Sequence, residues 1–179
     1  GDPLYALDSN GQLEPRLASS LPRISADGRT VTIPLRRDVL FHDGTRFNAE
    51  AMAFSLRRFL SIGTLSYVVG DRIASIEVED PYTLRLNLNR RSTSLEGLLT
   101  SLNLTPISPT AYSEHQDRFL HDRFVGTGPY RLTSFSEHQQ RLEPFDRYWG
   151  EPPSNDGLDL ITLSNSTACL LYTSDAADE

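Results

Sequence analysis

Two residue types that often carry chemistry are almost missing from the 179-residue sequence: there is no lysine, and the one cysteine is Cys169. A chain with one cysteine cannot form a disulfide within itself, and the part before Cys169 cannot hold a metal on thiolates. That part also offers no cysteine nucleophile. The sequence therefore excludes a disulfide scaffold and a zinc–thiolate fold.

Long hydrophobic runs are lacking as well. No window approaches the roughly 18 consecutive apolar residues that a membrane-spanning helix needs. The chain begins Gly1-Asp2-Pro3, whereas a secretory signal has a basic stretch followed by an apolar run. We expect that the natural start of the protein is missing, and with it any export signal.

Positive charge is supplied only by arginine and is spread along the chain. The net charge is −7, and the 17 basic residues are scattered except for the pairs Arg36-Arg37, Arg57-Arg58 and Arg90-Arg91. Nucleic-acid-binding domains normally present a basic face or stripe. An acidic chain with dispersed arginines argues against a nucleic-acid partner. With 38% hydrophobic and 23% charged residues, the composition instead indicates one globular domain.

The last residues, 169–179, differ abruptly in character from those before them. They read CLLYTSDAADE, and this string back-translates to DNA that resembles the transposase adapters used in library preparation. Such additions are excluded from fold reasoning. We interpret 169–179 as a non-native tail and residues 1–168 as a fragment of a longer protein. The alternative is a natural acidic terminus.

In residues 30–60, alternating apolar and polar side chains predict strands, and apolar side chains at helical spacing predict a helix. Residues Thr30–Leu35 alternate apolar and polar side chains after the turn-forming Asp27-Gly28, which predicts a half-buried strand. A second short strand is expected at Val39–Phe41. Asn48 is a good helix N-cap, and the apolar spacing that follows predicts an amphipathic helix over residues 49–60.

The remainder of the chain shows the same mixture of strands and helices. Residues 73–78 and Thr83–Leu88 flank Asp80-Pro81 and predict a hairpin, and a second helix is expected over Ser94–Leu102. Later strands follow the turn Gly126–Pro129 and are expected at residues 130–132, 141–143 and 158–163. Because there is no regular βαβ rhythm, the predicted fold class is α/β in the mixed, α+β sense.

No residue pattern in the chain predicts catalysis. His42-Asp43 has the residue types of a metal ligand or an acid–base pair, but the adjoining Gly44 favours a turn. His115 and His121 are not spaced to share one helical face, as a zinc pair on a helix would. Gly126-Thr127-Gly128 lacks the third glycine and the lysine of a phosphate loop. The serine nucleophile elbow is also absent, so we expect no enzyme activity, no metal site and no cofactor.

Three groups of motifs carry a resemblance to a known family. They are Leu13–Ala18 with Asp27–Arg36, Val39–Thr45 with Phe47–Glu50 and Ser55–Arg58, and Val125–Tyr130 with Tyr148–Gly150. In this order and spacing they resemble the family 5 extracellular solute-binding proteins, which include the periplasmic dipeptide-, oligopeptide- and nickel-binding proteins of ABC importers. The resemblance covers nearly all of residues 11–168.

The resemblance implies a two-lobed, hinged protein of the periplasmic-binding-protein type II-like fold, with its ligand between the lobes. Residues 1–168 would then be part of the first lobe, including its accessory subdomain, and the second lobe would be absent. A ligand that touches both lobes stabilises the closed form. We therefore expect the chain alone to bind solute weakly or not at all. The motif glycines and aromatics are expected to be architectural, with Trp149 in the core.

The function that the resemblance implies is the substrate-binding component of an ABC importer. Such a protein captures peptides or similar small solutes in the periplasm or at the cell envelope and delivers them to permease subunits. The same fold also occurs fused to DNA-binding domains, so the alternative is the ligand-sensing domain of a transcription regulator. Peptide, nickel-chelate, opine and sugar binders share these motifs, and the sequence leaves the ligand open.

For ligand contacts, the resemblance indicates two segments: the one around Tyr67 and the loop Ser101-Leu102-Asn103. Tyr67 can stack on a solute or hydrogen-bond to it, and Asn103 can bond a peptide backbone. The alternative for both segments is a surface loop or ordinary packing. In the nickel-binding relatives the matching positions carry a tryptophan and an arginine, whereas here Ser66 or Tyr67 and Leu102 occupy them. The metal-chelate function is therefore not carried over.

Overall fold

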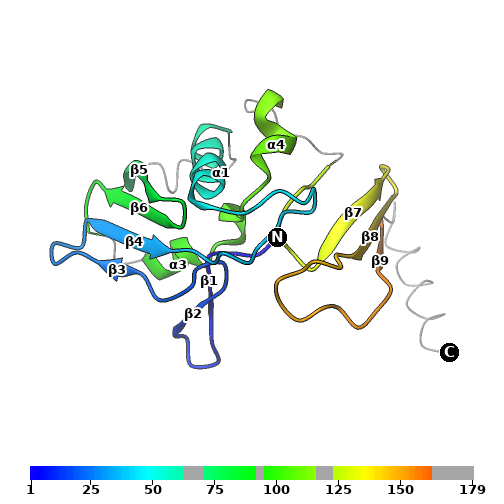
Figure 1. Ribbon diagram of the computed structural model, residues 1–179, viewed down its shortest axis with the longest axis horizontal. Coiled ribbons are helices and arrows are strands. Elements are labelled where there is room, and N and C mark those ends of the chain that lie inside the picture. The colour runs from blue at the N-terminus through cyan, green and yellow to red at the C-terminus, as the bar shows by residue number, and fades with distance from the viewer. Residues whose placement is uncertain (63–70, 92–94, 116–122, 163–179) are drawn as a thin grey trace.

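A computed structural model describes residues 1–62, 71–91, 95–115 and 123–162 (Figure 1). The strands are β1 (Tyr5–Leu7), β2 (Leu13–Pro15), β3 (Arg23–Ile24), β4 (Thr30–Pro34), β5 (Ile73–Asp80), β6 (Thr83–Leu88), β7 (Tyr130–Phe135), β8 (Gln139–Pro144) and β9 (Leu158–Ile161). The helical segments are α1 (Ala49–Ile62), α3 (Leu95–Leu99), η1 (Leu102–Leu104), α4 (Pro109–Tyr112) and η2 (Ser113–His115). Tyr67, His121 and the tail at 169–179 lie outside the described residues.

Within these ranges the strands form three antiparallel sheets, with the orders β1-β2, β3-β4-β6-β5 and β7-β8-β9. The four-stranded sheet and α1 lie together on one side of the molecule, and the β7–β9 sheet lies on the other side (Figure 1). The N-terminus is between them in this view. The architecture is therefore a mixed α and β fold, as the sequence predicts.

The main core lies between α1 and the four-stranded sheet. β4 pairs with β6 so that Val31 is opposite Leu86 and Ile33 is opposite Leu84. These four side chains are buried in one cluster with Met52 of α1. Full burial of an aliphatic side chain of this size contributes about 1.5–3 kcal/mol, so the alternation read from the sequence has a direct energetic cause.

Helix α1 begins at the predicted N-cap. The Asn48 Oδ1 atom accepts a hydrogen bond from the backbone N–H of Ala51 at 2.9 Å, which satisfies one of the donors left free in the first helical turn. The helix runs from Ala49 to Ile62 and so extends past the predicted end at residue 60. The predicted helix is confirmed, with a longer C-terminal end.

We expect the Asn48→Ala substitution to lower the free energy of unfolding by about 1 kcal/mol, because alanine leaves the Ala51 N–H without its side-chain acceptor. Urea denaturation of the 179-residue chain measures this change. Asn48→Ser is the matched control, since serine caps helices about as well as asparagine. Equal stability of the alanine and serine variants would contradict the capping role.

The strand predicted at Val39–Phe41 is wrong. Leu40 makes only an isolated bridge, because the chain turns back at once: the Gly44 N–H donates to the Phe41 carbonyl at 2.8 Å, and the Phe41 N–H donates to the Thr45 carbonyl at 2.9 Å. Gly44 has a φ of 84°, in the region that favours glycine. The segment is a tight turn that anchors the fully buried Phe41 ring in the core.

The helix predicted over Ser94–Leu102 is also wrong in its extent. α3 ends at Leu99, and a separate 3-10 turn, η1, starts after Ser101. The Ser101 hydroxyl accepts a hydrogen bond from the Asn103 N–H at 3.3 Å. Serine side chains compete in this way with the bonding of a helix interior, so a new turn begins where periodicity predicted a continuous helix.

The later elements follow the prediction with shifted ends. The β5–β6 hairpin is confirmed, with Val78 opposite Leu84. β7 runs on to Phe135, past the predicted end at residue 132, and β9 ends at Ile161. The differences are at strand ends, where pairing rather than side-chain alternation determines the length.

A set of polar contacts, which we call the junction, joins the β7–β9 sheet to the main core. Asp2 is only 6% exposed. Its carboxylate accepts hydrogen bonds from the Thr127 hydroxyl at 3.4 Å, the Tyr148 hydroxyl at 3.2 Å and the Trp149 indole N–H at 3.0 Å. Burial, reinforced by the charge of Asp2, raises the pKa of Tyr148 to about 12. The tyrosine therefore stays a neutral donor to this carboxylate.

His42 forms the second part of the junction. Its Nε2 atom lies 2.9 Å from the Gly128 carbonyl oxygen, and its Nδ1 atom accepts a hydrogen bond from the Gly126 N–H at 3.3 Å. Because a carbonyl oxygen faces Nε2 and an N–H group faces Nδ1, the ring is the neutral imidazole that carries its proton on Nε2. Burial lowers the pKa of His42, and the ring packs edge-on against Phe145, with centroids 5.1 Å apart. The turn predicted at His42-Asp43 is confirmed.

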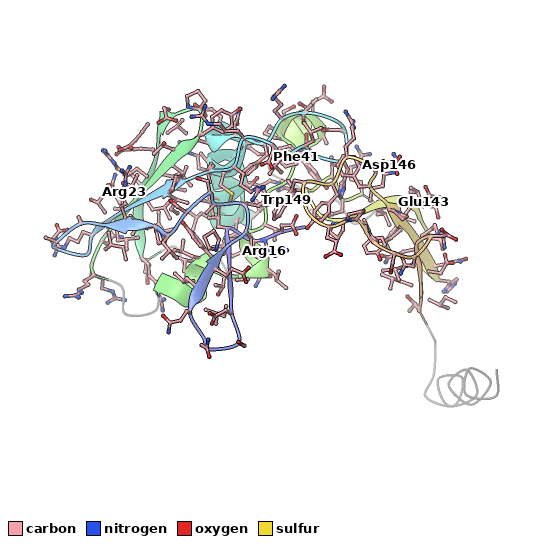
Figure 2. All side chains as sticks on the ribbon, turned by 60° about the horizontal axis from the view of Figure 1, so that its bottom comes forward. Arg16, Arg23, Phe41, Glu143, Asp146 and Trp149 are labelled. Atoms are coloured by element: carbon pink, nitrogen blue, oxygen red, sulfur yellow. The ribbon has the colours of Figure 1, made fainter. Side chains whose placement is uncertain are left out.

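Trp149 is half-buried and packs against the core, so the prediction of a core tryptophan holds only in part. The guanidinium carbon of Arg36 lies 4.4 Å from the centroid of the indole ring, and that of Arg16 lies 5.4 Å from it. Figure 2 shows Arg16 and Trp149 close together near the middle of the molecule. Such cation–π contacts contribute about 0.5–1 kcal/mol at exposed sites, and they support an architectural role for the tryptophan.

Candidate ligand-binding pocket

The sequence-predicted loop residues lie on the short turn η1 and its N-cap. The Leu102 side chain is 69% exposed, and Asn103 is exposed beside it. Ser101 is half-buried and acts locally, through the cap that its hydroxyl makes for Asn103. Tyr67 lies outside the described residues. The structure therefore leaves Leu102 and Asn103 exposed, whereas Ser101 holds the turn in place.

Leu102 and Asn103 border a hollow of about 250 Å³, which we call the η1 pocket. Its other walls come from the last turns of α1, from the segment that follows η1, and from residues just before β7. The lining residues are Ser55, Arg58, Phe59, Ile62, Leu102, Asn103, Thr105, Ile107, Tyr112, Arg123 and Phe124. The fold thus brings together residues from four separate parts of the sequence.

The floor of the η1 pocket is fixed by Ser55 of α1. This side chain is 7% exposed, and its hydroxyl accepts a hydrogen bond from the Ile107 N–H at 3.0 Å. The same oxygen lies 3.2 Å from the Ile107 carbonyl and 2.9 Å from the Ala51 carbonyl. One hydroxyl therefore ties the helix to the segment after η1 and joins two walls of the pocket.

Tyr112 fixes the opposite wall. It is buried, and its hydroxyl donates to the Arg123 carbonyl at 3.0 Å and accepts from the Val125 N–H at 3.3 Å. The guanidinium carbon of Arg58 lies 5.5 Å from the centroid of the Tyr112 ring. One tyrosine therefore positions both arginines of the pocket, Arg123 through its backbone and Arg58 through the ring.

The lining suits the recognition of a small solute that has an anionic end and an apolar part. Arg58 and Arg123 supply guanidinium groups, and Phe59, Phe124 and other apolar side chains supply contact area. Arginine binds carboxylates through paired N–H donors. No carboxylate, histidine or cysteine is among the described residues that line the pocket.

Sequence reasoning missed most of this pocket. Arg58 and Phe59 lie on the predicted helix, but helical spacing assigns them only to a face, without indicating what that face meets. Arg123 and Phe124 follow a segment with no periodic pattern. The one available signal was the adjacent pair Arg57-Arg58, which is unusual in a chain whose arginines are mostly single.

Within the described residues, no helix is long and apolar enough to cross a bilayer. No group of three or more histidine, cysteine, aspartate or glutamate side chains is arranged there to hold a metal ion. His42 is committed to the junction through both ring nitrogens.

Comparison with known proteins gives a consistent family. The model described as bacterial extracellular solute-binding proteins, family 5 Middle, matches residues 12–177. The glutathione-binding protein GsiB of Salmonella choleraesuis (strain SC-B67) is 32% identical over 180 residues, which cover 97% of this chain and 35% of GsiB. The chain therefore spans about a third of the length of the curated relatives it matches.

Solved structures agree with this result. An ABC transporter substrate-binding protein from Sinorhizobium meliloti matches with a TM-score of 0.82 at 28% identity, covering 95% of this chain and 35% of that protein. DppA from Helicobacter pylori, in complex with the peptide STSA, matches with a TM-score of 0.83 at 27% identity, covering 98% of this chain and 39% of that protein. The predicted type II-like periplasmic-binding-protein fold is confirmed. The chain belongs to family 5 of the bacterial extracellular solute-binding proteins.

Proposed function

We propose that the chain is part of the solute-binding component of an ABC importer that captures a peptide or a similar small solute outside the cytoplasmic membrane. The observation that carries this proposal is the η1 pocket, where Leu102 and Asn103 border the same hollow as Arg58 and Arg123. Family membership supports the class of function. Two relatives have compatible ligands: one is named a glutathione-binding protein, and the other contains a bound peptide.

Each part of the pocket has a role in this proposal. The terminal carboxylate of a peptide pairs with Arg58 or Arg123, and an apolar side chain packs on Phe59 or Phe124. The Asn103 amide bonds the peptide backbone, and Leu102 adds apolar contact. Tyr67, outside the described residues, is proposed as a further contact because the family resemblance indicates its segment.

The proposal treats residues 1–168 as part of one lobe and 169–179 as a non-native tail. Because a solute held between two lobes stabilises the closed form through contacts with both, the η1 pocket supplies only part of the binding energy. Permease subunits in the membrane are the proposed partners, in the periplasm or at the cell envelope, with no role for nucleic acid or for catalysis.

We expect the Arg123→Leu substitution in the full-length protein to weaken the binding of a carboxylate-bearing peptide by about tenfold or more, since a hydrogen bond to a charged group contributes about 1.5–3 kcal/mol. Isothermal titration with a mixture of di- and tripeptides, followed by the tightest single peptide, measures the loss. The backbone contact of residue 123 with Tyr112 is retained in this variant.

Arg23→Leu is the matched control, because Arg23 is an exposed arginine on β3. It should leave the dissociation constant unchanged. The proposed function fails if the full-length wild-type protein shows no heat of binding with peptides, glutathione or related small solutes. The pocket assignment fails if the Arg123 and Arg23 variants bind equally well.

A further inference from the structure

A second hollow lies along α1, at the start of α4. This groove of about 700 Å³, which we call the α1–α4 groove, is lined by α1, the turn before it and the first residues of α4. Ser108, the residue before α4, donates a hydrogen bond from its hydroxyl to the Asp43 carboxylate and lies 3.3 Å from the Thr45 hydroxyl. Burial raises the pKa of Asp43, but the hydrogen bonds from Ser108 and Thr45 outweigh it, so the net shift is downward and the carboxylate stays charged. These hydrogen bonds connect the turn before α1 to the start of α4, so the two sides of the groove are joined.

The groove is positively charged in an acidic chain. Three arginines, Arg46, Arg57 and Arg58, line it with one acid, Glu50, although the whole chain has a net charge of −7. Arg46 and Arg57 are both exposed. In the part of the chain that the structure describes, no ion pair links either of them to a carboxylate. This charge distribution favours an anionic occupant.

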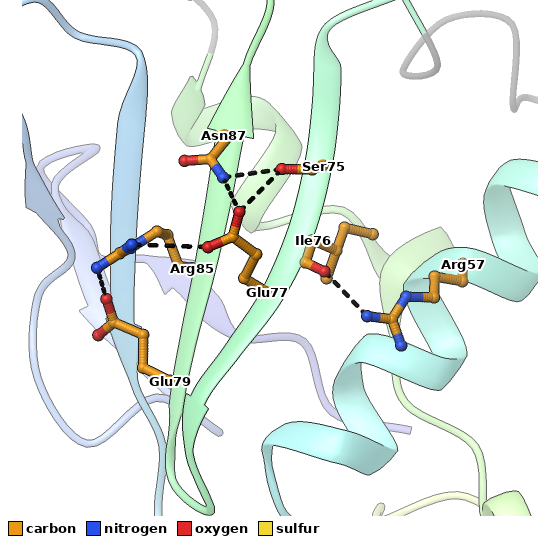
Figure 3. A network of polar contacts seen from close by, with 7 residues as sticks. All are labelled: Arg57, Ser75, Ile76, Glu77, Glu79, Arg85 and Asn87. Atoms are coloured by element: carbon orange, nitrogen blue, oxygen red, sulfur yellow. Dashed lines mark hydrogen bonds and ion pairs between the residues drawn. The ribbon is translucent and has the colours of Figure 1, made fainter.

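Arg85, on the neighbouring four-stranded sheet, differs from the groove arginines because it is paired with carboxylates. Arg85 of β6 pairs with Glu77 at 3.6 Å and with Glu79, both on β5 (Figure 3). Arg57, by comparison, donates one hydrogen bond to the Ile76 carbonyl at 2.9 Å, and Figure 3 shows its side chain reaching from α1 to that backbone. This bond holds the guanidinium group in place and uses one of its five N–H donors, so a positioned cation remains at the groove.

The arginines start from backbone positions that are spread along the groove. Arg46 lies just before α1, and the helix rises about 12 Å from Ala49 to Arg57 at 1.5 Å per residue. An extended polypeptide covers the same distance in about four residues, and the half-buried Phe54 between the ends gives it an apolar contact.

We propose that the α1–α4 groove is a docking surface for an extended acidic segment of the importer's membrane permease. The identity of the partner rests on the proposed function, because a solute-binding component must associate transiently with its permease. Charge complementarity at an exposed surface mainly accelerates association and is screened by salt, which is suited to a contact that forms and breaks in every transport cycle. The groove is a different surface from the η1 pocket, although Arg58 lines both.

The test uses the full-length protein and its permease complex in lipid nanodiscs. In 0.15 M salt, the Arg46→Glu/Arg57→Glu variant should associate with the permease at least about tenfold more slowly than wild type. Arg23→Glu/Arg29→Glu is the matched control, with the same charge change at two other exposed arginines, and should associate within about twofold of the wild-type rate. The association rate is measured by surface plasmon resonance.

Arg46→Glu alone keeps the Arg57 contact with Ile76, so it gives a result even if the double variant is poorly folded. It should slow association by about threefold, and the difference from wild type should shrink in 0.5 M salt. Equal rates for groove and control variants would overturn the proposal, as would a wild-type protein that does not dock. Solute affinity, measured separately by titration, should be the same in all variants. If the wild-type protein binds no solute, that result counts against the importer function. The ratio of the association rates of the groove and control variants tests the groove separately.

Discussion

Replacing Asp2 by alanine should lower the free energy of unfolding of the 179-residue chain by about 3 kcal/mol. The Asp2 carboxylate accepts hydrogen bonds from Thr127, Tyr148 and Trp149. Alanine would leave these three donors without their acceptor; Thr127 is fully buried, whereas Tyr148 and Trp149 are half-buried. A fully buried unsatisfied donor costs about 1–3 kcal/mol, and a half-buried one costs less because water reaches it. Urea denaturation followed by tryptophan fluorescence reports on the junction itself, because Trp149 is the one tryptophan in the chain.

Two variants make this test specific. Asp146→Ala removes an exposed carboxylate, labelled in Figure 2, and should change stability by less than about 0.5 kcal/mol. Asp2→Asn keeps a neutral oxygen acceptor at the same place and should give an intermediate loss. If Asp2→Ala is no more damaging than Asp146→Ala, the carboxylate does not hold the junction together.

Replacing His42 by leucine should lower the free energy of unfolding by about 2 kcal/mol at pH 8, and by clearly less at pH 5. Leucine leaves the Gly126 N–H and the Gly128 carbonyl without their imidazole partner. In wild type, burial is the largest cause that lowers the pKa of His42; the terminal amine of Gly1 also lowers it, whereas backbone hydrogen bonds and Asp2 act in the opposite direction.

The pH dependence follows from the sign of this shift. A group whose pKa is lower in the folded than in the unfolded state contributes stability that is fully present above the unfolded pKa, near 6.5. That contribution is lost as the pH falls toward the folded pKa. Denaturation curves of wild type and variant between pH 5 and pH 8 measure it. His138→Leu, at an exposed histidine, is the control. A His42→Leu effect that is constant over this range would contradict the neutral-imidazole assignment.

The elements that the sequence predicted correctly are those determined by neighbours along the chain. The alternation in β4 and in the β5–β6 hairpin, and the spacing in α1 after Asn48, each place apolar groups on one face. The errors arise where a local hydrogen bond competes with the bonding of the predicted strand or helix. At Phe41 a turn closes after one bridge, and at Ser101 a side chain caps a new turn. Periodicity is insensitive to both effects.

The candidate site was predicted only where a family pattern reached it. Leu102 and Asn103 were expected to contact a ligand, and the structure places both beside the η1 pocket; the ligand contact itself stays a prediction. Arg123 was missed because its place depends on the bond between its carbonyl and Tyr112. Asp2 was missed because its partners are distant in the sequence. Tertiary contacts of this kind leave no periodic signal, since any two polar residues are chemically able to make them.

The wide sequence separation within the junction also has a kinetic consequence. Asp2 and Trp149 are 147 positions apart, so their contact closes a long loop, and the entropic cost of that closure slows it. The hairpin of β5 and β6 needs only local loop closure. As the chain folds, the acidic side chain of Asp2 therefore remains hydrated while nearby strands pair, and the junction forms after them.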